Sequence, residues 1–297
     1  MISSIARPRQ VGVLRTPYHT SPASLFLLFC GFHPGFGLEW QVLATTHSPV
    51  FIDVSKPHTT IVRIARGGGS RTKVFSTDRA AFSGEERENL RMVRSCHPTV
   101  TEFFFADSVW LVEGETEHAV YSELLQRSDL DASRGVHIVN CMGKGNLPLF
   151  ARILNQFGSS YTVIHDTDCP RIQREGKWHR NGMWTINEQL VQVIQEHAGG
   201  SATRSLVAQV PDFEVHYFGR KLTADKPWQA IRTLYREDFG SSDETELLRN
   251  AADAILKGTH DGLYVSGEQL REKVKRWVES EKPTPAEMWD IEVDPVV

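Results

Sequence analysis

Two short segments place carboxylates directly after apolar runs, where a buried strand would end. VWLVEGETEH carries Glu113 at the end of its apolar run and Glu117 four residues later, while VIHDTD ends in Asp166 and Asp168. Anions packed together repel one another unless a cation neutralises them, and hard divalent cations prefer oxygen ligands. The four acids are therefore candidate metal ligands and candidate catalytic residues for Mg²⁺ or Mn²⁺ chemistry.

Two such ions, about 3.5–4 Å apart, can clamp the attacking and leaving oxygens of a phosphodiester. The alternative explanation is structural, because acids near a helix N-terminus are favoured by the helix dipole and by capping. Glu115 and Glu117 alone would fit that explanation. The metal hypothesis requires the two acidic segments to meet at one edge of a sheet.

The elements that would position these acids alternate between strand and helix. Continuous apolar runs predict strands covered on both faces, and apolar residues at 3.6-residue spacing predict the helices. The predicted strands span residues 108–112, 136–140 and 161–168, and the helices between them span 115–126 and 146–157. This order predicts an α/β fold with a parallel sheet and right-handed crossovers, which binds ligands at the carboxyl ends of its strands.

A change of pattern near residue 100 predicts two domains, 1–100 and 101–297. The second domain is completed by a helix at 184–197, a strand at 205–210 and three helices between residues 226 and 281. The first domain is expected to be small and β-rich. Its predicted elements are a strand at 41–45, a hairpin of 59–65 and 71–76 around three glycines, and a helix at 84–94.

The composition is that of a globular chain without a strong charge. Its 297 residues are 40% hydrophobic and 24% charged, with a formal net charge of −4, so a contact with DNA would need a local basic patch. The four cysteines are scattered without a CxxC pair, which argues against a zinc site and favours a reducing, cytoplasmic setting. The longest apolar run, residues 24–32, is far shorter than the roughly 20 residues of a membrane span, so no membrane association is expected.

The sequence contains three motifs in this order: LVEGETE, GKGN and VIHDTD. Together they resemble the Toprim catalytic domain, and more narrowly the Toprim domain of the OLD (overcoming lysogenization defect) nucleases. The resemblance covers about residues 41–230. It implies a Toprim-like, Rossmann-like sheet flanked by helices, with metals held by Glu113, Glu117, Asp166 and Asp168. It also implies a metal-dependent DNA endonuclease that hydrolyses phosphodiester bonds, with a role in defence against phage or other foreign DNA.

The same resemblance assigns roles outside the central motifs. Family members use a later acid and a lysine, which implies that Glu214 is a further metal ligand and that Lys226 stabilises transition-state charge. Their Toprim domain follows an ABC-type ATPase domain, so residues 1–100 would be a truncated ATPase remnant and His47 a relic of its nucleotide switch. No P-loop precedes His47, and GGGSRTK lacks the terminal G-K-[ST]. We therefore do not expect ATP to bind this chain alone, and we expect a homodimer or a partner chain that carries the P-loop.

A basic loop is predicted at residues 170–180, directly after Asp168, and it would lie where a phosphate backbone approaches the acids. A solvated loop without function is the alternative. Trp178 could stack on a base, whereas Trp184 and Trp228 are expected in the core. The expected DNA-contacting residues are Lys144, Arg171, Arg174, Lys177 and Arg180.

Other functions stay open at this point. A haloacid-dehalogenase-type phosphatase also uses DxD after a strand, but it needs a later acidic motif such as GDxxxD, which this sequence lacks. A Toprim topoisomerase or primase is a second alternative, although no tyrosine here has the context of a topoisomerase nucleophile. A third is an inactive fragment that only binds DNA or a partner chain, and metal-dependent DNA cleavage would distinguish it from a nuclease.

Overall fold

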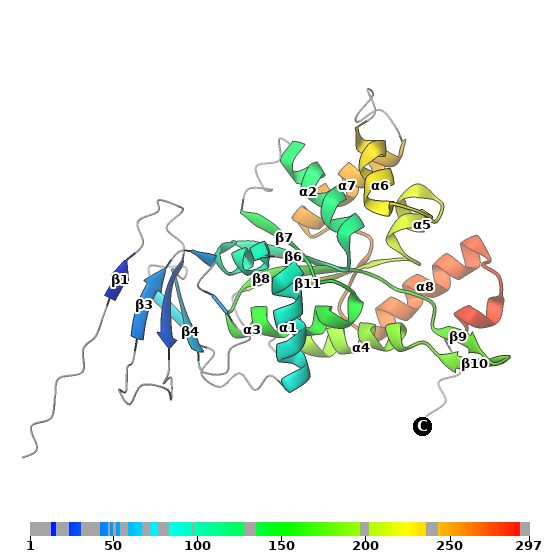
Figure 1. Ribbon diagram of the computed structural model, residues 1–297. Coiled ribbons are helices and arrows are strands. Elements are labelled where there is room, and N and C mark those ends of the chain that lie inside the picture. Colours follow the sequence, from blue (N-terminus) through cyan, green and yellow to red (C-terminus); the bar gives the residue numbers. More distant parts are fainter. Residues whose placement is uncertain are drawn as a thin grey trace, which may run out of the picture. The chain divides into compact units, whose positions relative to one another are not determined.

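The computed structural model of the chain describes residues 13–15, 24–30, 42–46, 48–49, 52–53, 59–66, 72–76, 83–96, 98–127, 135–196, 202–235 and 243–291. They belong to two compact units, Met1–Phe105 and Ala106–Val297, and each unit is described by itself (Figure 1). Residue 100, where the sequence predicts the domain boundary, lies in the last element of the first unit.

The first unit is built on a sheet with the strand order β1-β3-β2-β4-β5. Strand β1 runs parallel to β3, and the other neighbouring strands are antiparallel. The strands are β1 (Val13–Arg15), β2 (Ser24–Cys30), β3 (Val42–Thr46), β4 (Thr59–Arg66) and β5 (Thr72–Ser76). Pairing of β4 with β5 confirms the hairpin predicted around the three glycines.

Helix α1 (Gly84–Cys96) confirms the helix predicted after this hairpin. A capping box begins it, because the Ser83 N–H donates to the Glu86 carboxylate at 2.8 Å and the Glu86 N–H donates to Ser83 Oγ at 3.1 Å. The unit ends in the 3₁₀ helix η3 (Pro98–Phe105), whose Phe103 and Phe104 are buried.

The second unit contains a mixed, mostly parallel sheet with the order β12-β11-β8-β6-β7. Strands β11, β8, β6 and β7 are parallel, and β12 is antiparallel to β11. The strands are β6 (Ser108–Val112), β7 (Val136–Asn140), β8 (Ser160–Asp166), β11 (Arg204–Gln209) and β12 (Leu263–Tyr264). The α/β class and the parallel sheet predicted from the strand–helix alternation are confirmed.

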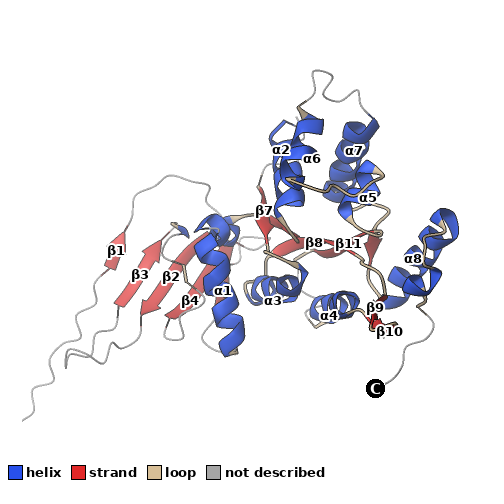
Figure 2. Ribbon diagram, turned by 45° about the vertical axis from the view of Figure 1, so that its right-hand side comes forward, coloured by secondary structure: helices blue, strands red, loops and turns tan. Residues whose placement is uncertain are grey.

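Helices cover both faces of this sheet (Figure 2). One face carries α2 (Glu115–Arg127), α5 (Phe213–Phe218), α6 (Lys226–Leu234) and α7 (Asp243–Lys257). The other carries α3 (Leu147–Gln156) and α4 (Gly182–Gln195), and α8 (Gly267–Glu281) packs against α4 and β12.

Burial on both faces explains the continuous apolar run of β6. Trp110 and Val112 join the core formed with α2 and α7, whereas Val109 and Leu111 alternate to the opposite face, toward α3. All four side chains are almost fully buried. The backbone position at the end of β6 is therefore fixed by packing on two sides. None of the helices in the described ranges is long and apolar enough to span a bilayer.

The segment after Asp168 differs from the predicted loop. It forms an antiparallel hairpin of β9 (Arg171–Arg174) and β10 (Lys177–Arg180). Glu175 and Gly176 make the turn with φ of 50° and 77°, as a type I′ turn requires. The polar composition of both strands hid them from a search for apolar alternation.

Three further departures from prediction have simple causes. The strand expected to reach Asp168 ends at Asp166, because Asp168 adopts a left-handed φ of 57° that extended pairing does not allow. Helix α5 and strand β12 are too short to show a periodic pattern. Trp184 is buried as expected, but Trp228 is 67% exposed, because α6 turns Ala230 and Leu234 to the core instead.

Gly262 offers a test of the sheet edge. The Ala208 N–H donates to Gly262 O at 3.0 Å, and a Cβ at residue 262 would overlap the Ala208 carbonyl oxygen, a backbone atom that cannot move aside alone. We expect Gly262→Ala to lower the free energy of unfolding by about 1–3 kcal/mol in chemical denaturation.

The matched control is Gly267→Ala at the start of α8, where an added Cβ meets no atom within 4 Å. That change should alter the free energy of unfolding by less than about 1 kcal/mol, in the stabilising direction. Equal effects of the two substitutions would contradict the close approach of β11 and the Gly262 backbone.

Candidate functional site

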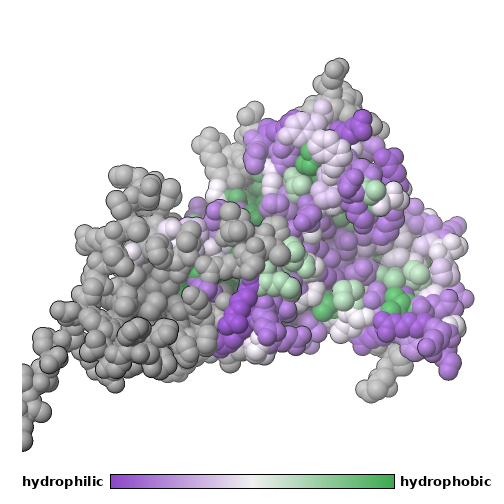
Figure 3. All heavy atoms as spheres, in the orientation of Figure 1, coloured by the Kyte–Doolittle hydropathy of each residue, from purple (hydrophilic) through white to green (hydrophobic). Residues whose placement is uncertain are grey.

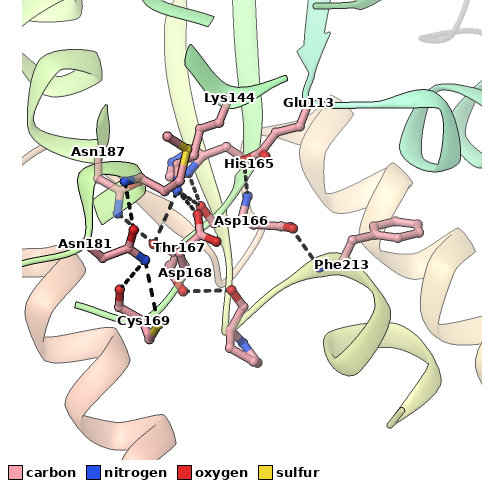
Figure 4. Close-up of polar contacts among 12 residues, drawn as sticks. Glu113, Lys144, His165, Asp166, Thr167, Asp168, Cys169, Asn181, Asn187 and Phe213 are labelled. Carbon is pink, nitrogen blue, oxygen red and sulfur yellow. Dashed lines mark hydrogen bonds and ion pairs between the residues drawn. The ribbon is translucent and has the colours of Figure 1, made fainter. Parts of the chain in front are cut away.

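Neighbouring parallel strands bring the two acidic segments together. Val112 of β6 pairs with Ile164 of β8, so both strands end at one edge of the sheet. Glu113 follows β6 directly and accepts a hydrogen bond from the Asp166 N–H on its Oε1, at 2.8 Å (Figure 4). The expected meeting of Glu113 with Asp166 is therefore present.

The segment that follows a third strand, β11, leads into helix α5, and the start of this helix also contacts the acids. The Asp166 carboxylate accepts a hydrogen bond from the Phe213 N–H at 2.8 Å, in the first turn of α5 (Figure 4). Asp212 caps the same helix, because its Oδ1 accepts a hydrogen bond from the Val215 N–H at 3.0 Å. Sequence reasoning missed Asp212, although it follows the strand predicted at 205–210 much as Glu113 follows its own strand.

Burial and mutual repulsion disfavour the charged forms of three carboxylates. Burial, opposed by Lys144 and assisted by Asp168 and Glu117, raises the pKa of Glu113 to about 8. Burial and the charges of Glu113, Glu117 and Asp212 raise the pKa of Asp166 well above its ordinary range. The pKa of Glu117 is raised too, by burial and by Glu214. Strongly shifted pKa values of this kind cluster at functional sites.

The other acids of the cluster are paired with lysines. The Nζ–carboxylate distances are 2.7 Å for Lys144–Asp168, 2.6 Å for Lys221–Asp212 and 2.7 Å for Lys226–Glu214. Glu113, Glu117 and Asp166 stand outside these three ion pairs. The structure thus places Glu214 and Lys226 close enough to Glu117 for both to influence its pKa. The roles that the family resemblance implies for them, as metal ligand and as charge-stabilising lysine, stay predictions. The structure adds Lys221, which no pattern in the sequence distinguishes from an ordinary surface lysine.

Lys144 has a different position from the one expected of a DNA-contacting residue. Its side chain is only 2% exposed. The ammonium donates hydrogen bonds to the backbone oxygens of Asp166 and Thr167 and to the Asp168 carboxylate.

A buried histidine, His165, fixes the backbone at the end of β8 by hydrogen bonds. His165 is fully buried, with Nδ1 2.8 Å from Asp166 O and Nε2 2.7 Å from the Tyr264 hydroxyl of β12. A carbonyl oxygen can only accept, so Nδ1 carries the proton and Nε2 accepts from the Tyr264 hydroxyl. Burial and the nearby Lys144 lower the pKa of His165 to about 3. A neutral imidazole therefore fixes the backbone that carries Asp166.

A family model described as "Overcoming lysogenization defect protein-like, TOPRIM domain" matches residues 104–168. Those residues contain both acidic segments and the GKGN motif. The chain carries an OLD-like Toprim domain.

The OLD nuclease of Thermus scotoductus is 25% identical to this chain over 230 residues. The match covers 74% of this chain. A match of this length is longer than the second unit, residues 106–297, so it extends into the first unit. It covers 42% of the relative, so the chain matches less than half the length of that nuclease. His47 lies outside the described residues, and its role as a nucleotide-switch relic stays a prediction.

The four Lys and Arg residues of the β9–β10 hairpin divide into two kinds. Arg171 forms an ion pair with Asp290 at 3.5 Å, and Arg180 one with Glu188 at 2.7 Å. Arg174 and Lys177 face each other across β9 and β10 next to the turn, and both are exposed.

Hydrophilic side chains cover most of the visible surface of the second unit (Figure 3).

The donor set is of a type that suits a hard divalent cation, because carboxylate oxygens are the ligands that Mg²⁺ and Mn²⁺ prefer. Among the described residues, no three His, Cys, Asp or Glu side chains form a metal-binding group. Glu113 and Asp166 accept hydrogen bonds from backbone N–H groups, and Asp168 forms an ion pair with Lys144. Burial raises the pKa values of Glu113 and Glu117, and it outweighs the charges of Lys144 and Lys226, which lower them, respectively.

The raised pKa of Glu113 has a consequence for stability. Its pKa is about 8 in the folded protein but near 4.5 in the unfolded chain, so the folded state binds more protons between these values. Over this range the unfolded chain loses the Glu113 proton while the folded protein keeps it, so the free energy of unfolding falls as the pH rises from about 4.5 to about 8. We expect Glu113→Gln, which keeps the acceptor for the Asp166 N–H, to raise the melting temperature of the metal-free protein by about 2–4 °C above pH 8.

The gain should be smaller at pH 6, where Glu113 is already mostly protonated. Thermal unfolding in EDTA at both pH values measures it. Glu115→Gln is the control, since Glu115 is exposed in the first turn of α2, two residues after Glu113. An equal gain at both pH values, or the same gain in the control, would contradict the charge explanation.

Proposed function

We propose that this chain is a metal-dependent DNA endonuclease of the OLD-like Toprim type. The observation that carries the proposal is the group of three carboxylates, Glu113, Glu117 and Asp166, that stands outside the three lysine ion pairs of its cluster. Glu117 is buried, Glu113 and Asp166 are half-buried, and burial raises the pKa of all three. Carboxylates placed together in this way repel one another, and a divalent cation such as Mg²⁺ or Mn²⁺ would neutralise them.

Each residue of the cluster has a proposed part in phosphodiester hydrolysis. Glu113, Glu117 and Asp166 hold the cation, with Asp168 and Glu214 at the margin of the site. When bound, such a cation polarises a phosphoryl oxygen and lowers the pKa of a bound water. Lys226 is 49% exposed on its side chain, so it can leave Glu214 and stabilise the negative charge that develops on the phosphate.

The hairpin of β9 and β10 is the proposed DNA contact beside this site. It begins three residues after Asp168 and is tied back by the Asn181 N–H, which donates to Pro170 O at 2.8 Å. Arg174 and Lys177 are exposed at its tip, where phosphate oxygens can reach them.

More than half of the Thermus nuclease lies outside the region that this chain matches. This partial match supports a proposal about the assembly in which the chain acts. We propose that activity depends on a homodimer or on a partner chain that supplies the ATPase half with its P-loop. We also propose that the protein acts in the cytoplasm, in defence against foreign DNA. The same partial coverage favours a second candidate function. In that case the chain binds DNA or its partner without cleaving.

The central experiment is cleavage of supercoiled plasmid by the purified chain with Mg²⁺, Mn²⁺ or EDTA. We expect metal-dependent cleavage that Asp166→Asn lowers by at least about 100-fold, because the variant removes a charge from the metal-binding cluster. The control is Asp253→Asn on α7, where an acid away from the cluster forms only an ion pair with Lys257. That variant should cleave like the wild type.

Cleavage in EDTA, or full activity of Asp166→Asn, would contradict the metal-dependent nuclease. Absence of cleavage by a folded chain that still binds Mn²⁺ and DNA would instead support the binding module.

The hairpin makes a separate prediction about DNA affinity. Arg174→Ala with Lys177→Ala should weaken binding to any DNA sequence and reduce the slope of log K against log salt by about 0.9 for each phosphate that is no longer neutralised. Fluorescence anisotropy with a labelled duplex in Ca²⁺ measures both quantities. Lys257→Ala, an exposed lysine on α7, is the matched control and should change neither. An unchanged slope in the double variant would exclude the hairpin as a phosphate-binding element.

A further inference from the structure

Helix α6 carries two exposed aromatic side chains. Among the Phe, Trp and Tyr residues whose exposure the structure describes, Trp228 and Tyr235 are the two exposed ones, at 67% and 56%. Trp228 lies in the first turn of α6 and Tyr235 at its C-terminal end. Single exposed apolar residues are common on protein surfaces and need no explanation. These two are not scattered, because one short helix carries both.

Helical spacing places both rings on one face of α6, with Arg232 between them. Residues 228, 232 and 235 stand at i, i+4 and i+7, which share a face of an α-helix. All three are exposed, whereas Ala230 and Leu234 are buried in the core. With a rise of about 1.5 Å per residue, the rings lie about 10 Å apart along the helix axis, roughly three nucleotide spacings of a stacked strand. We call Trp228, Arg232 and Tyr235 the α6 stripe.

The α6 stripe begins next to the acidic site. Lys226, the first residue of α6, forms an ion pair with Glu214 at 2.7 Å, and its charge acts on Glu117. Trp228 follows two residues later. A group bound at Trp228 therefore lies within one helical turn of the lysine to which we assign the phosphate contact.

At its other end, the stripe is held by an arginine of α2. Helix α2 packs beside α6 (Figure 2). Its last residue, Arg127, lies over the Tyr235 ring with Cζ 4.1 Å from the ring centroid, and the Arg127 side chain donates a hydrogen bond to the Glu123 carboxylate. This cation–π contact orients the Tyr235 ring, while the residue stays 56% exposed. The ring is thus already positioned before any ligand arrives.

Aromatic rings that alternate with arginine on an exposed face suit a nucleic acid strand with unpaired bases. Every base has a π-face that stacks on Trp or Tyr, and arginine contacts the backbone between successive bases. Bases inside a duplex reach such a ring only after they leave the stack. Protein interfaces also use Trp, Tyr and Arg. The start of the stripe beside Lys226 favours the strand whose phosphate this lysine contacts.

We propose that the α6 stripe binds one DNA strand through unpaired bases, with Trp228 stacked on a base next to the phosphate that Lys226 contacts. The inference rests on the proposed nuclease function and adds to it a contact with bases. The exposed Arg174 and Lys177 of the β9–β10 hairpin offer contacts with phosphates alone. The α6 stripe therefore distinguishes a strand with unpaired bases from a closed duplex, and stacking of this kind tolerates every base.

The test measures the affinity of the full chain for three labelled probes in Ca²⁺ by fluorescence anisotropy. The probes are single-stranded oligothymidylate, a duplex of the same length, and an abasic strand that keeps the sugar-phosphate backbone. Trp228→Ala should weaken the binding of oligothymidylate by about tenfold, as the loss of one stacked base does. It should change the binding of the duplex and of the abasic strand by less than about twofold. Trp228→Phe keeps an aromatic face and should lose less affinity than Trp228→Ala.

Two further variants complete the test. Arg232→Ala removes the charge between the rings and should lower the slope of log K against log salt for oligothymidylate by about 0.7. The matched control is Val265→Ala, directly after β12, which shortens a side chain as exposed as Trp228, at 67%, and should change none of these quantities. Because all these side chains are exposed, the variants should melt within about 2 °C of the wild type.

Unchanged affinity for oligothymidylate in Trp228→Ala, or equal weakening for all three probes, would overturn the proposal while leaving metal-dependent cleavage of plasmid intact. A wild-type chain that self-associates in analytical ultracentrifugation, and loses only this association in Trp228→Ala, would assign the stripe to a second copy of the chain instead. If the wild type neither binds the probes nor cleaves plasmid, the proposed nuclease function falls together with the stripe. The assays therefore separate the two failures.

Discussion

Repulsion among buried carboxylates is the constraint on which the rest of this site depends. The sheet brings Glu113 and Asp166 within one hydrogen bond of each other, and Glu117 joins them from the first turn of α2. Burial denies these groups the solvent that would screen them, and the pKa of each is raised as a result. Holding these acids together costs the fold stability.

The fold supplies the rigidity that holds the acids together against this repulsion. Strand β6 is packed on both faces, so Glu113 cannot retreat from the edge of the sheet. Strand β8 is fixed behind Asp166 by His165, which reaches across to Tyr264 of β12. Helix α5 adds N–H donors at its first turn, where the helix dipole also favours a carboxylate. The acids are thus held by packing, by hydrogen bonds and by a helix terminus together.

Lysines divide the cluster into neutralised and unneutralised parts. Three acids have a lysine at 2.6–2.7 Å, and the three others have only backbone donors or no ion-pair partner among the described contacts. The cluster therefore has one part in which each acid is paired with a lysine and another part in which no acid forms such a pair.

Local pattern in the sequence was enough to predict the parallel sheet, its flanking helices and the acids at the strand ends. Continuous apolar runs can be satisfied only by strands buried on two faces, and parallel strands must end at a common edge. Pattern could not predict the polar hairpin of β9 and β10, the short helix α5, or the end of β8 at Asp166, because none of these has a periodic signal. The pairing of Asp212 and Asp168 with lysines was likewise hidden. Which charge neutralises which depends on distances between residues far apart in the chain, and only the tertiary structure sets those distances.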